Sequence, residues 1–468
     1  MYSLSTIHII GIVITLIGFS ALGIYSGRRV KSAADFAIGG RKASATVVSG
    51  TIMGTLVGGS ATVGTAELAF KYGMAAWWFH IGCGIGCAIL GLALAKSLHE
   101  SSLQTIPQYL LRTYGKNIGP ITSIFLSIGM FLSIVAQGLA VVALITSMFG
   151  LSPYAAAFIG VILVLGYVAF GGVFGTGMVG TAKMALLYPA TILTGAMAYY
   201  MIGGWSGAVA KFPAYPWFSF FGRGVTTDLA AGFSLVVGVI STQTYIQAIF
   251  SGRTFQEARK GALISACMIP PLGIFGIMVG LYMRANFPTM AASQALPMFI
   301  MNYVPAAVAG IILAVLLITT IGTWAGLTLG ISTMLTTDIY KKIINPEAAD
   351  RTILYLQRAL ILAVSLIGVL FITGNLKSMV LSWAFLSMGL RGCSILMPML
   401  GAMFFSRYVT PIAGLASAIL GPATNLIWQL AFPKGIDPLY PGLIVGLLTL
   451  VIISTVTRKK DCEESTSV

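Results

Sequence analysis

The stretch GTLVGGSATVG, residues 54–64, interrupts an apolar run that extends from residue 46 to residue 70. Its glycines at positions 54, 58 and 59 each weaken a helix by about 1 kcal/mol relative to alanine. A broken helix is tolerated inside a bilayer only where its freed backbone groups are buried in protein or line a polar cavity. Gly54 and Gly58 also have the spacing of a close helix–helix contact, so a packing face is the second interpretation.

Thirteen apolar, nearly uncharged runs of this kind can be counted along the 468 residues. A helix needs about 20 apolar residues to cross the hydrocarbon core of a bilayer. With 57% hydrophobic and only 8% charged residues, the composition excludes a water-soluble protein. We therefore predict an all-α integral membrane protein, with residues 1–468 forming one transmembrane domain. The predicted spans are 6–26, 46–70, 75–95, 120–149, 153–172, 178–203, 228–250, 261–283, 304–336, 355–375, 378–405, 409–432 and 441–457.

The positive charges follow these spans. Of the 27 lysines and arginines, 19 lie on one side of the predicted membrane and 6 on the other, and Lys183 and Arg391 complete the count. Loops facing the cytoplasm carry the excess of positive residues, so the N-terminus is predicted outside and the C-terminus in the cytoplasm of a multi-pass cell-membrane protein. The net charge of +15 thus reflects topology, and no nucleic-acid partner is expected.

A second span is interrupted in a similar way. The run 228–250 contains Gly238 and then the polar sequence Ser241-Thr242-Gln243-Thr244-Tyr245, with Gln247 following. Two interrupted spans at corresponding positions point to a transporter built from inverted repeats, with its binding site near the middle of the membrane.

The ninth span, 304–336, is rich in threonine. Thr319 and Thr323 are four residues apart and share a helix face, where hydroxyl and carbonyl oxygens could bind a small cation. The alternative is that each hydroxyl bonds the backbone carbonyl one turn earlier, as membrane threonines commonly do. The residues leave both interpretations open.

Three ionisable side chains lie within spans, and such residues are functional candidates by default. The planar guanidinium of Arg391 could hold a substrate carboxylate, or it could pair with Glu67. Lys183 could extend its ammonium to the interface, or it could be buried with a lowered proton affinity and carry a proton.

Three groups of motifs then make the chain resemble, over nearly its full length, the sodium:solute symporter family, which includes bacterial proline, sialic acid and sugar symporters. The groups are Gly39-Gly40-Arg41 with Gly64 and Tyr72-Gly73; Gln243-x-x-x-Gln247 with Glu257-Ala258-Arg259-Lys260-Gly261; and Leu296-Pro297 with Pro305, Gly310, the threonine-rich core and Asp338-Ile339-Tyr340.

This resemblance implies about thirteen transmembrane helices in a LeuT-type five-plus-five inverted repeat. The first repeat would span 46–203 and the second 228–405. An extra N-terminal helix, 6–26, and two C-terminal helices within 409–457 would lie outside the repeats.

The resemblance also implies a Na⁺ site that falls on Gly54, Val57, Thr319, Gly322 and Thr323. Gly322 departs from the family pattern, because many members have a serine or threonine there. A second departure is Lys183, which stands in the stretch 178–183 where many members carry an aspartate that assists sodium binding. The alternative to Na⁺ coupling is therefore a proton-coupled or uncoupled transporter in which the Lys183 ammonium replaces the bound cation.

The implied substrate site comprises Ser60, Ala61, Thr242, Gln243, Gln247 and Arg391, with Trp383 and Phe385 as candidate caps. The family's sugar binders use several polar amides on these helices, a role that the small Ser60 and Ala61 cannot fill. A small solute with a carboxylate, such as an amino acid, therefore fits better, because Arg391 could bind it. Glu67 and Lys183 are the candidates for gating or coupling.

We therefore expect a secondary active transporter that works by alternating access, with Na⁺ as coupling ion and no organic cofactor. An enzyme is not expected, because His8, His80 and His99 are widely scattered and show no metal-ligand spacing. A channel is not expected either, because no filter-like loop joins two spans.

Overall fold

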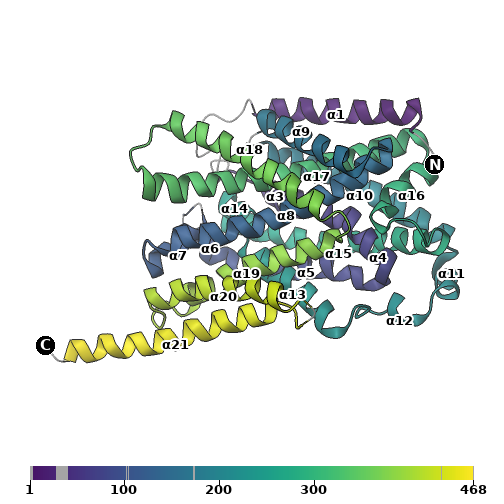
Figure 1. Ribbon diagram of the computed structural model, residues 1–468. Coiled ribbons are helices and arrows are strands. Elements are labelled where there is room, and N and C mark those ends of the chain that lie inside the picture. Colours follow the sequence, from purple (N-terminus) through teal and green to yellow (C-terminus); the bar gives the residue numbers. More distant parts are fainter. Residues whose placement is uncertain are drawn as a thin grey trace.

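The structure, a computed structural model, describes residues 4–27, 41–101, 103, 105–171, 174–433 and 435–466. Gly39 and Gly40 of the first motif lie outside these residues. Figure 1 shows a bundle of helices, and the described ranges contain no β-strand. The elements are α1 Thr6–Gly27, α3 Ala45–Leu56, η2 Ser60–Gly64, α4 Thr65–Tyr72, η3 Gly73–Trp77, α5 Trp78–Ile89, η4 Leu90–Leu94, α6 Ala95–Glu100, α7 Ile106–Tyr114, α8 Ile118–Phe149, α9 Pro153–Gly171, α10 Phe174–Met201, α11 Gly204–Lys211, α12 Ala214–Trp217, α13 Val225–Ser241, α14 Gln243–Ser251, α15 Phe255–Asn286, η5 Ala292–Gln294, α16 Ala295–Tyr303, α17 Ala306–Met334, η6 Leu335–Ile344, α18 Asp350–Gly374, α19 Val380–Phe404, α20 Pro411–Ala431 and α21 Leu439–Thr466.

Many of these helices are long and apolar enough to span a membrane. Within the described ranges there are 8, or up to 10 if each bent pair is one span. Shorter apolar helices at Thr6–Phe19, Ala45–Leu56 and Pro153–Tyr167 fall on predicted spans. The all-α membrane architecture is thus confirmed, and the number thirteen stays a prediction.

Both predicted interruptions are present. Helix α3 ends at Leu56, Val57 takes the non-helical angles φ −88° and ψ 84°, and the chain resumes at Ser60 as a short π-helix that leads into α4. Helices α13 and α14 are separated by Thr242, at φ −93° and ψ 126°, and are bent by 45°.

Helix α3 also makes a close helix contact through glycine, but the partner of Gly54 in that contact is Gly50 rather than Gly58. Gly58 lies beyond the end of α3 and faces Gln137 and Thr323. A Cβ on Gly54 would lie 2.8 Å from the Cα of Gly180 on α10. A Cβ on Gly180 would lie 2.5 Å from the carbonyl oxygen of Gly50. The backbones of α3 and α10 therefore touch at a point where only glycine fits.

The central helices form two groups. In the first, which we call the bundle, α15 packs on α3, α4 and α5, and α5 packs on α13. In the second, the scaffold, α8, α9, α17 and α18 pack on one another. Helix α10 packs on α3, and α19 packs on α13. In each predicted repeat, 46–203 and 228–405, the last long helix therefore packs on the first one. The division into these two repeats stays a prediction.

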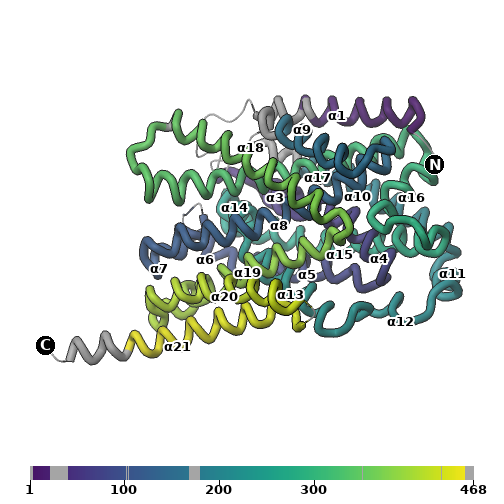
Figure 2. Tube along the Cα trace, in the orientation of Figure 1, coloured from purple at the N-terminus to yellow at the C-terminus, as the bar shows by residue number. Residues whose placement is uncertain are grey.

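The remaining long helices lie on the outside of this core. Helix α1 packs on α17 and α10 along one flank, and α20 and α21 lie side by side against α19 along the opposite flank (Figure 2). The peripheral position agrees with their predicted place outside the repeats. The binding site must therefore be sought between bundle and scaffold.

The contact between α3 and α10 gives a first prediction. Gly180→Ala should lower the free energy of unfolding by about 1–3 kcal/mol, because the added methyl group cannot be accommodated against Gly50 without backbone movement. Thermal unfolding in detergent measures this. Gly166→Ala on α9 is the control, since no atom of the described residues outside its own helix turns lies within 4 Å of its Cβ position. Equal melting temperatures for the two variants would contradict the packing.

Candidate substrate and cation site

A single glutamine from the scaffold holds the break in α3. The Oε1 of Gln137, on α8, accepts a hydrogen bond from the Gly59 N–H at 2.8 Å, and its Nε2 donates to Ser60 Oγ at 3.0 Å. Gln137 is only 3% exposed. It thus satisfies, inside the protein, a backbone donor that the break has freed. Sequence reasoning missed this residue; its one signal was a lone amide in the apolar run 120–149.

A small cavity is lined by residues that follow the two helix breaks. Ser60 from the first break and Tyr245, just after the second, both line it, together with Gln137. It has room for about one water molecule. The other lining residues are Thr55, Leu56, Phe79, Ser133, Thr323, Leu327, Ala384 and Met388. Ala61 lies elsewhere, lining a second small cavity with Val57 and Thr62.

Aromatic side chains border the cavity on the side of the α19 start. Phe79, which lines the cavity, lies with its ring centroid 6.2 Å from that of Phe385. The guanidinium of Arg223 lies over Phe385 at 5.3 Å and forms an ion pair of 2.6 Å with Asp228. Phe385 thus lies behind Phe79 and is not itself among the lining residues, and its role as a cap stays a prediction.

Arg391 is fully buried next to the second break. Its Nη1 donates to Thr242 Oγ1 at 3.1 Å, and its Nη2 donates to Ser387 Oγ at 2.6 Å. It forms no ion pair with any acid in the described ranges. Arg391 follows the lining residue Met388 by one turn of α19, so its charge lies just behind the cavity wall.

Glu67 does not meet Arg391 in this structure. Its carboxylate accepts a hydrogen bond from the backbone N–H of Val380 at 2.8 Å, which caps the start of α19. Val380 and Arg391 are 11 residues apart on that helix, or about 16 Å. The pairing interpretation of the two charges is therefore wrong for this conformation, and Glu67 instead ties α4 to α19.

The two glutamines of α14 are not among the cavity-lining residues. Gln243 Oε1 accepts a hydrogen bond from the Ile106 N–H at 2.9 Å, at the start of α7. Gln247 follows one turn later and is half-buried. Gln243 thus links the second break to the helix α7, and Thr242 connects that break to Arg391.

The threonines of α17 face the first break. Thr323 Oγ1 lies 2.8 Å from the position that a Cβ on Gly58 would take, and it donates to the Thr319 carbonyl at 3.0 Å. The back-bonding interpretation is therefore correct for Thr323. Thr319 Oγ1, however, is buried and has no hydrogen-bond partner among the described residues. A buried hydroxyl without a partner costs free energy and is suited to a cation that binds there.

Lys183, on α10, lies against α3. It is 4% exposed, and its Cε is 3.7 Å from the position that a Cβ on Gly54 would take. In the part of the chain that the structure describes, its ammonium makes no ion pair. The side chain is therefore inside the protein rather than extended to its surface.

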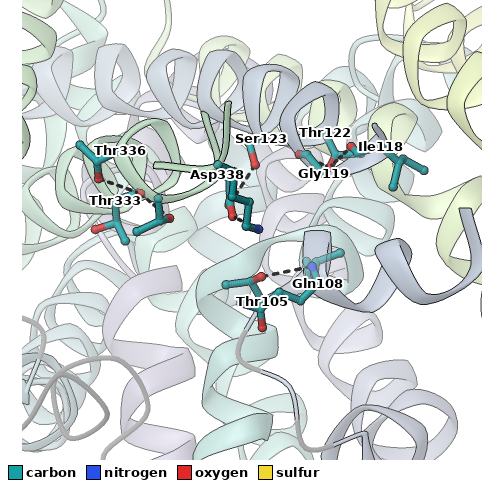
Figure 3. Close-up of polar contacts among 12 residues, drawn as sticks. Thr105, Gln108, Ile118, Gly119, Thr122, Ser123, Thr333, Thr336 and Asp338 are labelled. Atoms are coloured by element: carbon teal, nitrogen blue, oxygen red, sulfur yellow. Dashed lines mark hydrogen bonds and ion pairs between the residues drawn. The ribbon is translucent and has the colours of Figure 1, made fainter. Parts of the chain in front are cut away.

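The third motif places Asp338 away from the cavity, at the far end of α17. Asp338, which is 2% exposed, accepts hydrogen bonds from Ser123 Oγ at 3.1 Å and from Lys342 Nζ at 2.8 Å. Figure 3 shows the carboxylate between η6 and α8, with Thr105 capping the start of α7. Asp338 thus fastens two scaffold helices together.

A family model described as "Sodium:solute symporter family" matches residues 36–421. The "High-affinity proline transporter PutP" of Bacillus subtilis is 23% identical over 470 residues, covering 93% of this chain and 95% of that protein. The "Sodium/proline symporter" of Escherichia coli is 24% identical over 486 residues, covering 97% of this chain and 93% of that protein.

A solved structure gives the same indication for the fold. The solved protein is a Na⁺-coupled sialic acid symporter in a substrate-bound, outward-open state. Its structure matches this one with a TM-score of 0.77 and 17% sequence identity, and the match covers 97% of each chain. This likeness shows a common fold, which is the LeuT-type fold that the motifs implied.

The glutamine at the break gives a second prediction. Gln137→Leu keeps the side-chain volume but leaves the Gly59 N–H without a partner, which should cost about 1–3 kcal/mol of unfolding free energy. Amide hydrogen exchange across residues 57–61 should accelerate. Ser127→Ala on the same helix is the control, because its hydroxyl donates to the Ser123 carbonyl of its own helix at 2.7 Å. Unchanged exchange in Gln137→Leu would remove the assigned role.

Proposed function

This chain belongs to the sodium:solute symporter family, whose members are transporters and not enzymes, and we propose that it couples the inward movement of Na⁺ to that of a small organic carboxylate. The transport would proceed by alternating access. The cavity would be exposed first to one side of the membrane and then to the other, as the bundle moves against the scaffold.

The observation that carries the proposal is the cavity between the two helix breaks. Ser60 and Tyr245 bring both breaks to one space, and Thr323 brings the threonine-rich face of α17 to the same space. Irregular backbone at membrane depth is where transporters of this kind bind solutes and ions. A cation and a solute bound there would be near neighbours, so each could alter the binding of the other.

The cation is the cargo for which α17 and the first break offer oxygen atoms. The free hydroxyl of Thr319, the hydroxyl of Thr323 and the backbone at Gly54, Val57 and Gly322 form the candidate site. Because α3 is in the bundle and α17 in the scaffold, a cation between them would favour one arrangement of the two groups. Such a difference in affinity between conformations is what coupling requires.

The charge of Arg391 supports a carboxylate as the solute. A guanidinium that is fully buried, with hydroxyl partners and no acid among the described residues, creates a positive potential in a medium of low dielectric. An anionic group in the adjacent cavity would be attracted by it. The Bacillus and Escherichia relatives, which are named for proline, make proline the first solute to test.

Lys183 supports a second candidate function, transport coupled to protons or uncoupled. Its buried ammonium lies beside Gly54, one of the candidate cation ligands, and has no acid partner in the described ranges. In that case the side chain would take the place of the transported cation.

Uptake into proteoliposomes distinguishes these functions. We expect labelled proline or another small carboxylate to accumulate when a Na⁺ gradient is imposed. We expect no accumulation when choline replaces the Na⁺. Accumulation driven only by a proton gradient, and abolished by Lys183→Ala, would establish the second candidate instead.

Thr323→Ala should reduce Na⁺-driven uptake at least tenfold at low Na⁺, since it removes a candidate oxygen ligand and about 1.4 kcal/mol of binding free energy. Uptake measured over a series of Na⁺ concentrations gives the apparent affinity. The matched control is Thr328→Ala, whose hydroxyl is on the same helix and bonds the Trp324 carbonyl at 3.1 Å. If both variants weaken Na⁺ activation equally, the site is not at Thr323.

Arg391→Gln should lower the affinity for a carboxylate solute at least tenfold while leaving that for its uncharged amide analogue nearly unchanged, because the buried positive charge is lost. Arg391→Lys, which keeps the charge, should retain more of the discrimination. Competition of proline and prolinamide against labelled solute measures the ratio. A ratio unaffected by Arg391→Gln would exclude the carboxylate hypothesis.

A further inference from the structure

Tyr167, on scaffold helix α9, faces Gly322, the candidate cation ligand at which the chain lacks a side-chain hydroxyl. A Cβ built on Gly322 would lie 3.4 Å from the Tyr167 hydroxyl oxygen and 3.6 Å from the ring carbon that carries it. Among the described residues, no other atom lies within 4 Å of that position. The space in front of Gly322 is thus bordered by a phenol hydroxyl, at about the place that a serine hydroxyl would approach.

The Tyr167 hydroxyl is available to a ligand. Tyr167 is half-buried, and within the described ranges its hydroxyl has no hydrogen-bond partner. The hydroxyl of Thr319, one turn before Gly322 on α17, is likewise unpartnered and is buried. Residues three and four apart are neighbours on a helix surface, so Thr319, Gly322 and Thr323 share one region of α17.

We propose that Tyr167 supplies to the cation site the hydroxyl oxygen that Gly322 cannot, so that the site receives a ligand from α9 in addition to α3 and α17. A phenol hydroxyl is a neutral oxygen donor, which is the ligand type that hard cations prefer. This inference rests on the proposed cation-coupled function and adds a residue to it.

The geometry has a consequence for coupling. Helices α9 and α17 pack together in the scaffold, whereas α3 belongs to the bundle. A cation held by Tyr167 would therefore have two of its three helices on the scaffold, and it would remain with the scaffold until α3 moves away. Tyr167 would then set cation affinity without touching the solute.

The test is Na⁺ binding to the purified protein, read from the melting temperature in detergent as NaCl replaces choline chloride at constant ionic strength. A ligand that binds the native state raises its stability as a function of concentration, which gives the dissociation constant. We expect Tyr167→Phe to raise the dissociation constant for Na⁺ about tenfold. We expect Gly322→Ser, introduced into Tyr167→Phe, to restore most of the loss, because it places a hydroxyl in the same space.

Tyr154→Phe removes a hydroxyl from the exposed part of the same helix and serves as the control. The melting temperature in choline alone reports whether each variant folds. If the unmodified protein binds Na⁺ and Tyr167→Phe binds it equally well, the inference is wrong and the proposed function stands. If the unmodified protein shows no Na⁺-dependent stabilisation, Na⁺ coupling itself fails.

Discussion

The arrangement of this protein depends on how the break in α3 satisfies its backbone. Inside a bilayer no water is available to the N–H groups that a helix loses when it is interrupted. Gln137 provides the acceptor, and it comes from the scaffold while the break is in the bundle. The bond that permits the irregular backbone therefore also crosses the interface between the two groups of helices. The same side chain bonds Ser60 and, together with Ser60 and Thr323, lines the cavity.

The charged side chains divide into two kinds. Asp338 and Glu67 are bound to hydroxyl, ammonium or backbone N–H groups and fasten helices together near their ends. Arg391 and Lys183 are buried beside the breaks, and no acid in the described ranges pairs with them. Unpaired buried charge is costly in a membrane, so it is retained where it acts on something that binds. The distribution separates the residues that build the fold from those that give the cavity its chemistry.

Sequence reasoning located the features with a local signal. The two breaks were marked by glycines and polar residues within apolar runs, and Arg391 and Lys183 by charges within spans. Contacts between distant segments had no such signal: Gln137 meets Gly59 across 78 residues, and Gln243 meets Ile106 across 137. The interpretation that joined Glu67 to Arg391 failed because it used charge without the packing of α4 on α19. Tyr167 could not be predicted from the sequence either, because only the packing of α9 on α17 brings its hydroxyl to Gly322.

The central claim is that the two breaks form one site in which cation and solute influence each other. The most direct measurement is the dissociation constant of a bound carboxylate solute with and without saturating Na⁺, together with that of Na⁺ with and without saturating solute. Linkage requires the two ratios to be equal. We predict that each ligand tightens the binding of the other by the same factor of about ten or more, which corresponds to a coupling free energy of about 1.4 kcal/mol. A solute affinity that is independent of Na⁺ would contradict the account.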